Sequence, residues 1–214
     1  MQRLSTGAEL RVTGPTGGAT VVCVNGGQGA EVEGTWSASI EWLVRRLAPS
    51  FPGLVFAEVR YRIKSWKRMD WCVADTQAAV LETGAPRTLL LGFSMGGAVA
   101  IQAAAEPSVE TVLGLAPWIP DRLSLETLRG RRLDVLHGSL DRRLPGIPGV
   151  SAKGSRRGFD RARALGIEGA YTLIPGALHG IAFRSGSRAL PLPRAGTWAR
   201  LVAAELSRFQ AGAD

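Results

Sequence analysis

One stretch, residues 88–105, restricts the fold of this chain more than any other. Its sequence is TLLLGFSMGGAVAIQAAA: a short apolar run, a glycine-rich turn around Ser94 and an alanine-rich segment. The apolar run is long enough for a buried strand and too short for a helix, whereas alanine is the best helix former. The chain is therefore predicted to turn from a strand into a helix within a few residues, with Ser94 at the apex.

The glycines around Ser94 fit such a turn. Gly92 and Gly96 stand two residues before and two residues after the serine, in a G-x-S-x-G pattern. We expect a strained backbone at the apex, because neighbours without side chains let the strand and the helix approach each other. The serine hydroxyl would then lie above the strand end and beside the helix N-terminus, where negative charge is favoured.

The rest of the chain alternates strand patterns with helix patterns. Such alternation predicts an α/β protein with a single, mostly parallel sheet and helices on both faces. No repeat and no long linker interrupts it, so we predict one domain over residues 1–214. The predicted strands span 8–13, 19–24, 54–59, 88–91, 111–116, 133–136 and 170–174. The predicted helices span 37–48, 70–82, 98–105, 121–129, 158–165 and a closing segment around 198–206, with loops at 61–69 and 142–158. In the helix at 70–82 we expect Asp70 at the N-cap, Asp75 on the surface and Leu81 on the apolar side.

Composition excludes several classes of protein. The net charge is +8, but the basic residues are spread along the chain without a nucleic-acid-binding motif, so no nucleic-acid partner is expected. No apolar run approaches the length of a membrane span or a signal-peptide core. Cys23 and Cys72 fit buried thiols of a reducing compartment, which predicts a cytoplasmic protein. No metal-ligand spacing or phosphate-binding motif occurs, so neither a metal nor a cofactor is expected.

Four segments follow the ends of predicted strands: the glycine-rich residues 25–29, Ser94, the loop with Asp141 and the loop with His179. In a parallel sheet these ends meet at one edge, where ligands bind. A nucleophilic serine needs a base, and the base needs a group that fixes its tautomer. The only histidines are His137 and His179. We favour His179, which lies in a loop of small residues, and expect His137 to pack and hydrogen-bond locally at a strand edge.

The acid and the oxyanion donors are assigned in the same way. Asp141 is the preferred partner of the histidine, and Asp121, which follows the preceding strand, is the alternative. A developing oxyanion needs two backbone N–H groups. We expect one from Met95 at the helix start and the other from the glycine-rich loop, with Gly27 as first choice and Gln28 as second.

These motifs resemble those of the α/β-hydrolase family over essentially the whole chain. The likeness is carried by GFSMGG at 92–97, HGSLD at 137–141 and GALHG at 176–180. The order Ser, Asp, His is that of the family. The resemblance implies that Ser94 is the nucleophile, Asp141 the acid and His179 the base.

The size is similar to that of the small dienelactone-hydrolase-like and carboxylesterase branch, although dienelactone hydrolases proper carry cysteine at the apex. Only about 16 residues separate the strand at 111–116 from the strand at 133–136, which predicts little or no lid and an open site. One departure concerns the loop after the strand that precedes the first helix. Many family members have His-Gly there, whereas this chain has Asn25-Gly26, so the second oxyanion donor stays open.

Aromatic and basic residues near the strand ends are candidates for contacting substrate. Trp36, Trp66 and Trp118 either line the pocket or serve ordinary packing. A basic rim around the cleft would favour anionic substrates, and its candidates are Arg142, Arg143, Lys153, Arg156 and Arg157.

We predict a serine hydrolase that cleaves small soluble carboxylic esters through an acyl-enzyme, with a small-molecule substrate as its partner. A thioesterase, an acyltransferase or a carbon–carbon hydrolase would use the same three residues. A catalytically silent binding protein is the alternative outside the enzymes.

Overall fold

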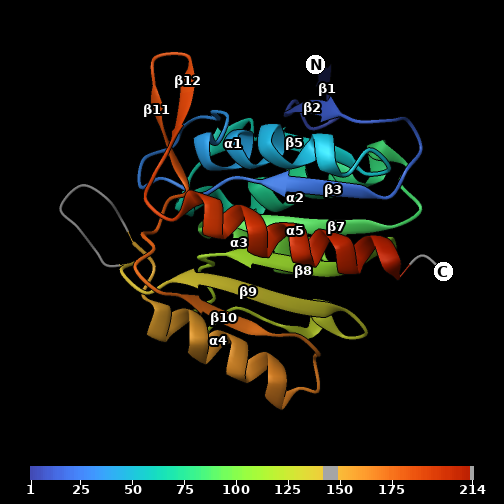
Figure 1. The fold of residues 1–214 in the computed structure, drawn as a ribbon. Helices are drawn as coiled ribbons and strands as arrows, with labels where there is room; N and C mark the ends of the chain where they lie inside the picture. The colour runs from blue at the N-terminus through green and yellow to red at the C-terminus, as the bar shows by residue number, and fades with distance from the viewer. Residues whose placement is uncertain (142–148, 213–214) are drawn as a thin grey trace.

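An eight-stranded sheet forms the centre of the molecule in the computed structural model, which describes residues 1–141 and 149–212 (Figure 1). Its strand order is β1-β2-β5-β3-β7-β8-β9-β10. The six strands from β5 to β10 in this order run parallel, and β1 and β2 pair antiparallel at one edge. The strands are β1 Gln2–Arg3, β2 Glu9–Thr13, β3 Thr20–Val24, β5 Val55–Arg60, β7 Thr88–Phe93, β8 Val109–Leu115, β9 Arg132–Gly138 and β10 Tyr171–Ile174. The predicted α/β class with a mostly parallel sheet is confirmed.

Helices cover both faces of this sheet (Figure 1). They are α1 Ala38–Leu47, α2 Met69–Thr83, α3 Met95–Ala103, α4 Ala152–Ala164 and α5 Ala195–Ala211. Helices α1 and α5 share one hydrophobic cluster with Val21 and Cys23 of β3, and α2, α3 and α4 share the other with Val22 and Val24. Strands that are buried on both faces have continuous apolar sequences. Strand β3, with the sequence TVVCV, is an example, because all of its residues are buried. Among the described helices, none is long and apolar enough to cross a membrane.

Several short elements lie outside the central sheet. Two antiparallel ribbons stand apart from it: β4 Val32–Glu33 with β6 Ile63–Lys64, and β11 Ala182–Ser185 with β12 Arg188–Pro191. The 3-10 helices are η1 Ala48–Ser50, η2 Trp66–Arg68 and η3 Glu126–Leu128. Residues 116–131, between β8 and β9, hold only η3, so no lid is inserted between these strands, as predicted. Sequence analysis did not predict either ribbon, and the predicted loop at 61–69 contains β6 and η2.

Helix α4 corrects the prediction for 142–158, because it begins at Ala152 and not at residue 158. The Ser151 hydroxyl accepts the Gly154 N–H and caps the helix. Ser155, Phe159 and Ala162 are buried along one face, at helical spacing. The predicted helix at 121–129 is wrong as well, because only η3 forms within it.

Helix α2 differs from expectation in three side chains. Arg68, not Asp70, occupies the N-cap, and Asp70 lies in the first turn, where its charge favours the helix dipole. Asp75 was predicted on the surface, but it is fully buried and accepts the Arg62 N–H at 3.0 Å. Leu81 was predicted on the apolar side, but its side chain is exposed.

Candidate active site

Ser94 occupies a tight turn between β7, which ends at Phe93, and α3, which begins at Met95. Its φ of 57° and ψ of −121° are rare for a residue with a side chain. The Ser94 N–H donates to the Leu115 carbonyl at 2.9 Å, and the Ser94 carbonyl accepts the N–H groups of Gly97 and Trp118, also at 2.9 Å. Three backbone hydrogen bonds therefore hold the strained conformation that the sequence predicted.

The glycines around Ser94 lie where side chains do not fit. A Cβ at Gly92 would clash with the Gly96 backbone, and a Cβ at Gly96 would lie 2.6 Å from the Asn25 carbonyl oxygen. A Cβ at Gly97 would clash with Pro117. The close crossing of strand and helix therefore depends on glycine at these positions.

Three side chains from three loops meet at the carboxyl edge of the sheet. Ser94 Oγ lies 3.0 Å from His179 Nε2, and His179 Nδ1 lies 2.7 Å from Asp141 Oδ2. A carboxylate only accepts hydrogen bonds, so Nδ1 carries the proton and Nε2 is free to accept from the serine hydroxyl. Asp121, the alternative acid, is exposed and lies 3.9 Å from Arg157 instead.

His137 is a further contact of Asp141 that sequence analysis missed. It is fully buried, as expected of a locally packed histidine, but its Nε2 lies 3.0 Å from Asp141 Oδ2 and 3.0 Å from the Val150 carbonyl oxygen. Both partners are acceptors, so Nε2 carries a proton and is shared between them. The signal available in the sequence was the four-residue spacing from His137 to Asp141 across a strand end.

The surroundings of Asp141 keep its carboxylate charged. Burial by itself would raise the pKa of Asp141, but hydrogen bonds from His137 and then His179 outweigh it and lower the pKa below the ordinary value. The Val150 N–H also donates to Oδ1 at 3.2 Å. The aspartate therefore stays ionised at neutral pH, although its side chain has no contact with solvent.

A cavity of about 280 Å³ opens at Ser94 and His179. Its wall includes Trp36 and Trp66, two of the predicted pocket residues, and Lys64, which sequence analysis did not single out. Trp118 lines a neighbouring cavity of about 630 Å³ that reaches Asp141. The rings of Trp66 and Trp118 meet edge to face, 4.6 Å apart, between the two cavities.

The glycine-rich loop after β3 lies against the start of α3. A Cβ at Gly27 would clash with Met95 Sδ, so a larger residue there would displace the Met95 side chain. The Asn25 side chain accepts the Gly26 N–H at 2.7 Å and donates to the Thr35 carbonyl at 2.9 Å, so the residue that replaces histidine here fixes the loop. The Gly26 N–H is thereby occupied. Met95 is the first residue of α3, and an N–H in that position has no acceptor within the helix.

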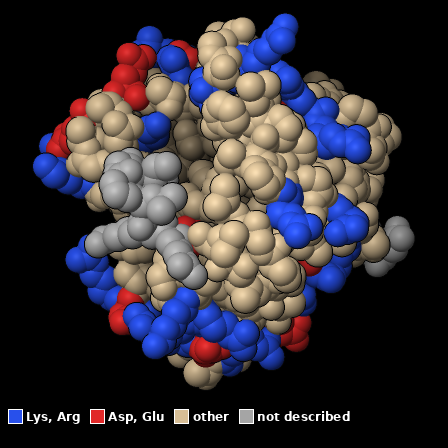
Figure 2. All heavy atoms as spheres, turned by 60° about the vertical axis from the view of Figure 1, so that its left-hand side comes forward, with Lys and Arg blue, Asp and Glu red and all other residues tan. Residues whose placement is uncertain are grey.

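Three residues of the predicted basic rim, Lys153, Arg156 and Arg157, lie in the part of the chain that the structure describes. Arg142 and Arg143 lie outside the described residues. Arg157 lines the cavity of about 630 Å³, whereas Arg156 is paired with Asp160 at 2.8 Å and the exposed Lys153 does not line it. In the view of Figure 2, Lys and Arg side chains are distributed around the molecule, and uncharged residues lie at the centre of the view.

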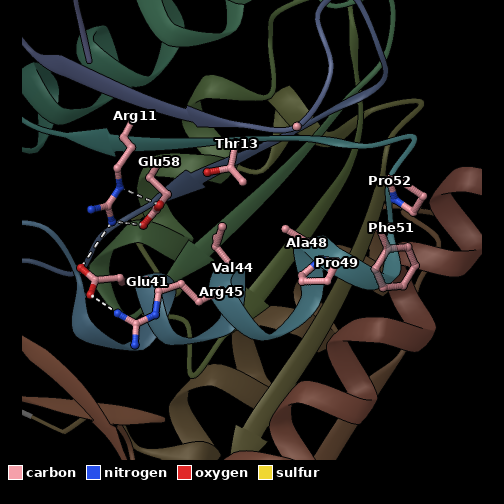
Figure 3. A pocket seen from close by; sticks show the side chains of 11 residues that line it. Arg11, Thr13, Glu41, Val44, Arg45, Ala48, Pro49, Phe51, Pro52 and Glu58 are labelled. Carbon is pink, nitrogen blue, oxygen red and sulfur yellow. Dashed lines mark hydrogen bonds and ion pairs between the residues drawn. The ribbon is translucent and has the colours of Figure 1, made fainter.

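A third cavity, of about 510 Å³, is built on α1 and the strands β2 and β5, away from Ser94 (Figure 3). Arg11 donates to both Glu58 oxygens at 2.9 and 2.7 Å and lies 3.4 Å from Glu41. Arg45 also pairs with Glu41, at 3.4 Å, so in the wall of this cavity the two carboxylates are balanced by two arginines. Both cysteines are free and buried, as predicted, and burial raises the pKa of Cys72 to about 11. Within residues 1–141 and 149–212 no three metal-ligating side chains cluster.

Comparison with known proteins identifies the fold. No family model and no curated protein sequence matches the chain. Among solved structures, esterase PE8 superposes with a TM-score of 0.68 at 17% identity, covering 94% of this chain and 99% of that one. A dienelactone hydrolase from Anabaena variabilis has a TM-score of 0.64 at 17% identity and 94% and 93% coverage. An α/β serine hydrolase without lid from Xanthomonas campestris has a TM-score of 0.58 at 15% identity, with 83% of each chain covered.

At these identities the likeness establishes the architecture. The chain has the α/β-hydrolase fold, and the resemblance first seen in its three motifs is confirmed at that level.

Proposed function

We propose that the chain is a serine hydrolase that cleaves carboxylic esters. The observation that carries this proposal is the continuous line of hydrogen bonds from Ser94 Oγ through His179 to Asp141, with distances of 3.0 and 2.7 Å. Its three members stand at the carboxyl edge of a parallel sheet, which is where ligands bind in such folds. The esterases among the similar folds add support for this reaction class.

In the proposed mechanism Ser94 Oγ attacks the ester carbonyl carbon while His179 Nε2 takes the hydroxyl proton. The imidazole becomes a cation between Ser94 and Asp141, and the buried carboxylate stabilises it and keeps Nδ1–H aligned. Base catalysis of this kind contributes about 10²- to 10⁴-fold to the rate.

The carbonyl oxygen becomes negatively charged in the same step. We assign the first donor to this oxygen to the backbone N–H of Met95, because it lies at the positive end of α3. Gly27 is the proposed second donor, with Gln28 as the alternative, because the Gly26 N–H already bonds Asn25.

The second half of the reaction restores the enzyme. His179 gives its proton to the leaving alkoxide, so the carbon–oxygen bond of the ester breaks and an acyl group remains on Ser94. Water then enters, loses a proton to His179 and attacks the acyl carbonyl. The bond to Ser94 breaks, Oγ regains its proton, and the acid leaves.

The same residues would serve thioester hydrolysis or transfer of the acyl group to an alcohol. Hydrolysis is favoured over transfer because no lid separates the site from water between β8 and β9. Product analysis with an added alcohol separates the two: a hydrolase yields mainly the acid, and a transferase yields a new ester.

Labelling with a fluorophosphonate probe, with mass spectrometry to locate the modified residue, tests the proposal. We expect modification of Ser94, its loss in Ser94→Ala, and its retention in Ser187→Ala, which alters an exposed serine in the β11–β12 turn. Turnover of short-chain aryl esters should follow the same pattern. A folded wild-type protein that neither reacts with the probe nor cleaves any ester would overturn the proposal and favour a binding protein.

A further inference from the structure

Lys64 places a positively charged side chain in the wall of the cavity at Ser94. It comes from the short strand β6 and lines the cavity of about 280 Å³, and no other Lys, Arg, Asp or Glu is among the described residues of that wall. Its Nζ donates to the Thr35 hydroxyl at 2.8 Å. The cavity that exposes the reactive serine therefore has a positive charge on one side.

The acidic residues nearest to Lys64 in the ribbon are occupied by arginines. Lys64 pairs with Val32 across the ribbon, between Glu31 and Glu33 of the opposite chain segment. Those two carboxylates form ion pairs elsewhere, Glu31 with Arg68 at 3.1 Å and Glu33 with Arg60 at 3.7 Å. Within residues 1–141 and 149–212, Lys64 has no carboxylate within ion-pair distance, so its charge is uncompensated.

An uncompensated and half-buried ammonium is a favourable place for an anion. Burial lowers the pKa of Lys64, which expresses the cost of removing this charge from water. The ammonium has three N–H groups, of which Thr35 accepts one, so two remain for a ligand. A carboxylate bound there would form charge-assisted hydrogen bonds and offset the burial cost.

We propose that Lys64 forms an anion subsite of the Ser94 site, and that the preferred substrates are small esters whose acid or alcohol part carries a carboxylate. This inference rests on the proposed ester hydrolysis. The walls formed by Trp36, Trp66 and Phe93 contact the uncharged body of such a substrate, while Lys64 holds its anionic end. The cavity volume of about 280 Å³ fits small acids better than long acyl chains.

Two matched pairs of esters test the subsite. On the alcohol side, 4-acetoxybenzoate is compared with its methyl ester, and on the acyl side, phenyl hydrogen adipate with phenyl methyl adipate. We expect Lys64→Gln to lower kcat/KM for the anionic member of at least one pair by about tenfold or more and to change the neutral member less than about twofold. Lys67→Gln, which removes an exposed lysine three residues away, should leave both members unchanged.

A measurement on the wild-type protein supports the comparison without relying on a variant. Raising the salt from about 50 mM to about 0.5 M should lower kcat/KM for the anionic ester and leave that for the neutral ester unchanged. Lys64→Arg should preserve the preference for the anion. Equal effects of Lys64→Gln on both members of both pairs, with the neutral esters still cleaved, would overturn the subsite and leave the hydrolase proposal intact. Failure of every ester with the wild-type protein would overturn both.

Discussion

His137 Nε2 lies 3.0 Å from Asp141 Oδ2, the same carboxylate oxygen that faces His179 Nδ1 at 2.7 Å. The two histidines of the chain therefore bind one oxygen from two sides. His137 is fully buried at the end of β9, so its ring cannot turn away easily, and the Val150 carbonyl fixes which of its nitrogens carries the proton. The carboxylate that orients His179 is itself oriented by this second imidazole.

His137 should accordingly be a positioning residue in ester cleavage. Replacing it with Leu removes one N–H from a buried carboxylate, which costs about 1.5–3 kcal/mol and should reduce kcat/KM by about 10- to 100-fold. His137→Gln retains an amide N–H near the place of Nε2 and should recover most of that loss. Steady-state kinetics of both variants checks the prediction, and a merely structural role is indicated if Gln rescues nothing while both variants label normally at Ser94.

The acid stability of the protein should depend on Asp141. Its pKa is lower in the folded protein than the ordinary value of 3.8, so its contribution to the free energy of unfolding is complete above that value. The contribution decreases as the pH falls from 3.8 toward the folded pKa. Urea unfolding of the wild type and of Asp141→Asn should therefore show a stability gap at pH 7 that narrows below about pH 4. A gap that stays constant down to pH 2 contradicts the assignment.

The site could be predicted from the sequence to the extent that its chemistry is local. The G-x-S-x-G pattern marks Ser94, and a parallel sheet brings the ends of its strands to one edge, so Asp141 and His179 follow from topology and from a choice between two histidines. Asp75 was misplaced because its partner, Arg62, lies outside the helix that carries it. Lys64 was missed because its position depends on the pairing of two short segments that are distant in sequence.

Helix α4 shows a similar limit. Gly154 and Gly158 favour the prediction of a loop over its first turns, because glycine is unfavourable in helix interiors. The packing gives Gly158 a reason to be there, because a Cβ at that position would clash with Ile119. Contacts with a distant segment thus outweigh the local preference, and no pattern within the helix could reveal them.

The same substitution at two helical glycines should have opposite effects on stability. In Gly97→Ala the new methyl group meets Pro117, and overpacking of this kind costs about 1–3 kcal/mol. In Gly196→Ala, within α5, no atom lies within 4 Å of the new Cβ, and the better helix propensity should stabilise by about 0.5–1 kcal/mol. Urea unfolding at neutral pH measures both. Destabilisation of similar size at the two sites would mean that the close approach of α3 to Pro117 is not what restricts Gly97.

The strained backbone of Ser94 leads to the last prediction, which separates stability from activity. With φ at 57° the residue adopts a conformation that glycine reaches freely, and strain of this kind costs about 1–3 kcal/mol. Ser94→Ala keeps a Cβ and therefore the strain, whereas Ser94→Gly relieves it at the cost of about 0.5–1 kcal/mol in chain entropy. Both variants should lose ester cleavage, but the Gly variant should unfold at a higher urea concentration than the Ala variant. If the Ala variant proves the more stable of the two, the turn imposes no strain on Ser94, and the unusual backbone angles there have no cost in free energy.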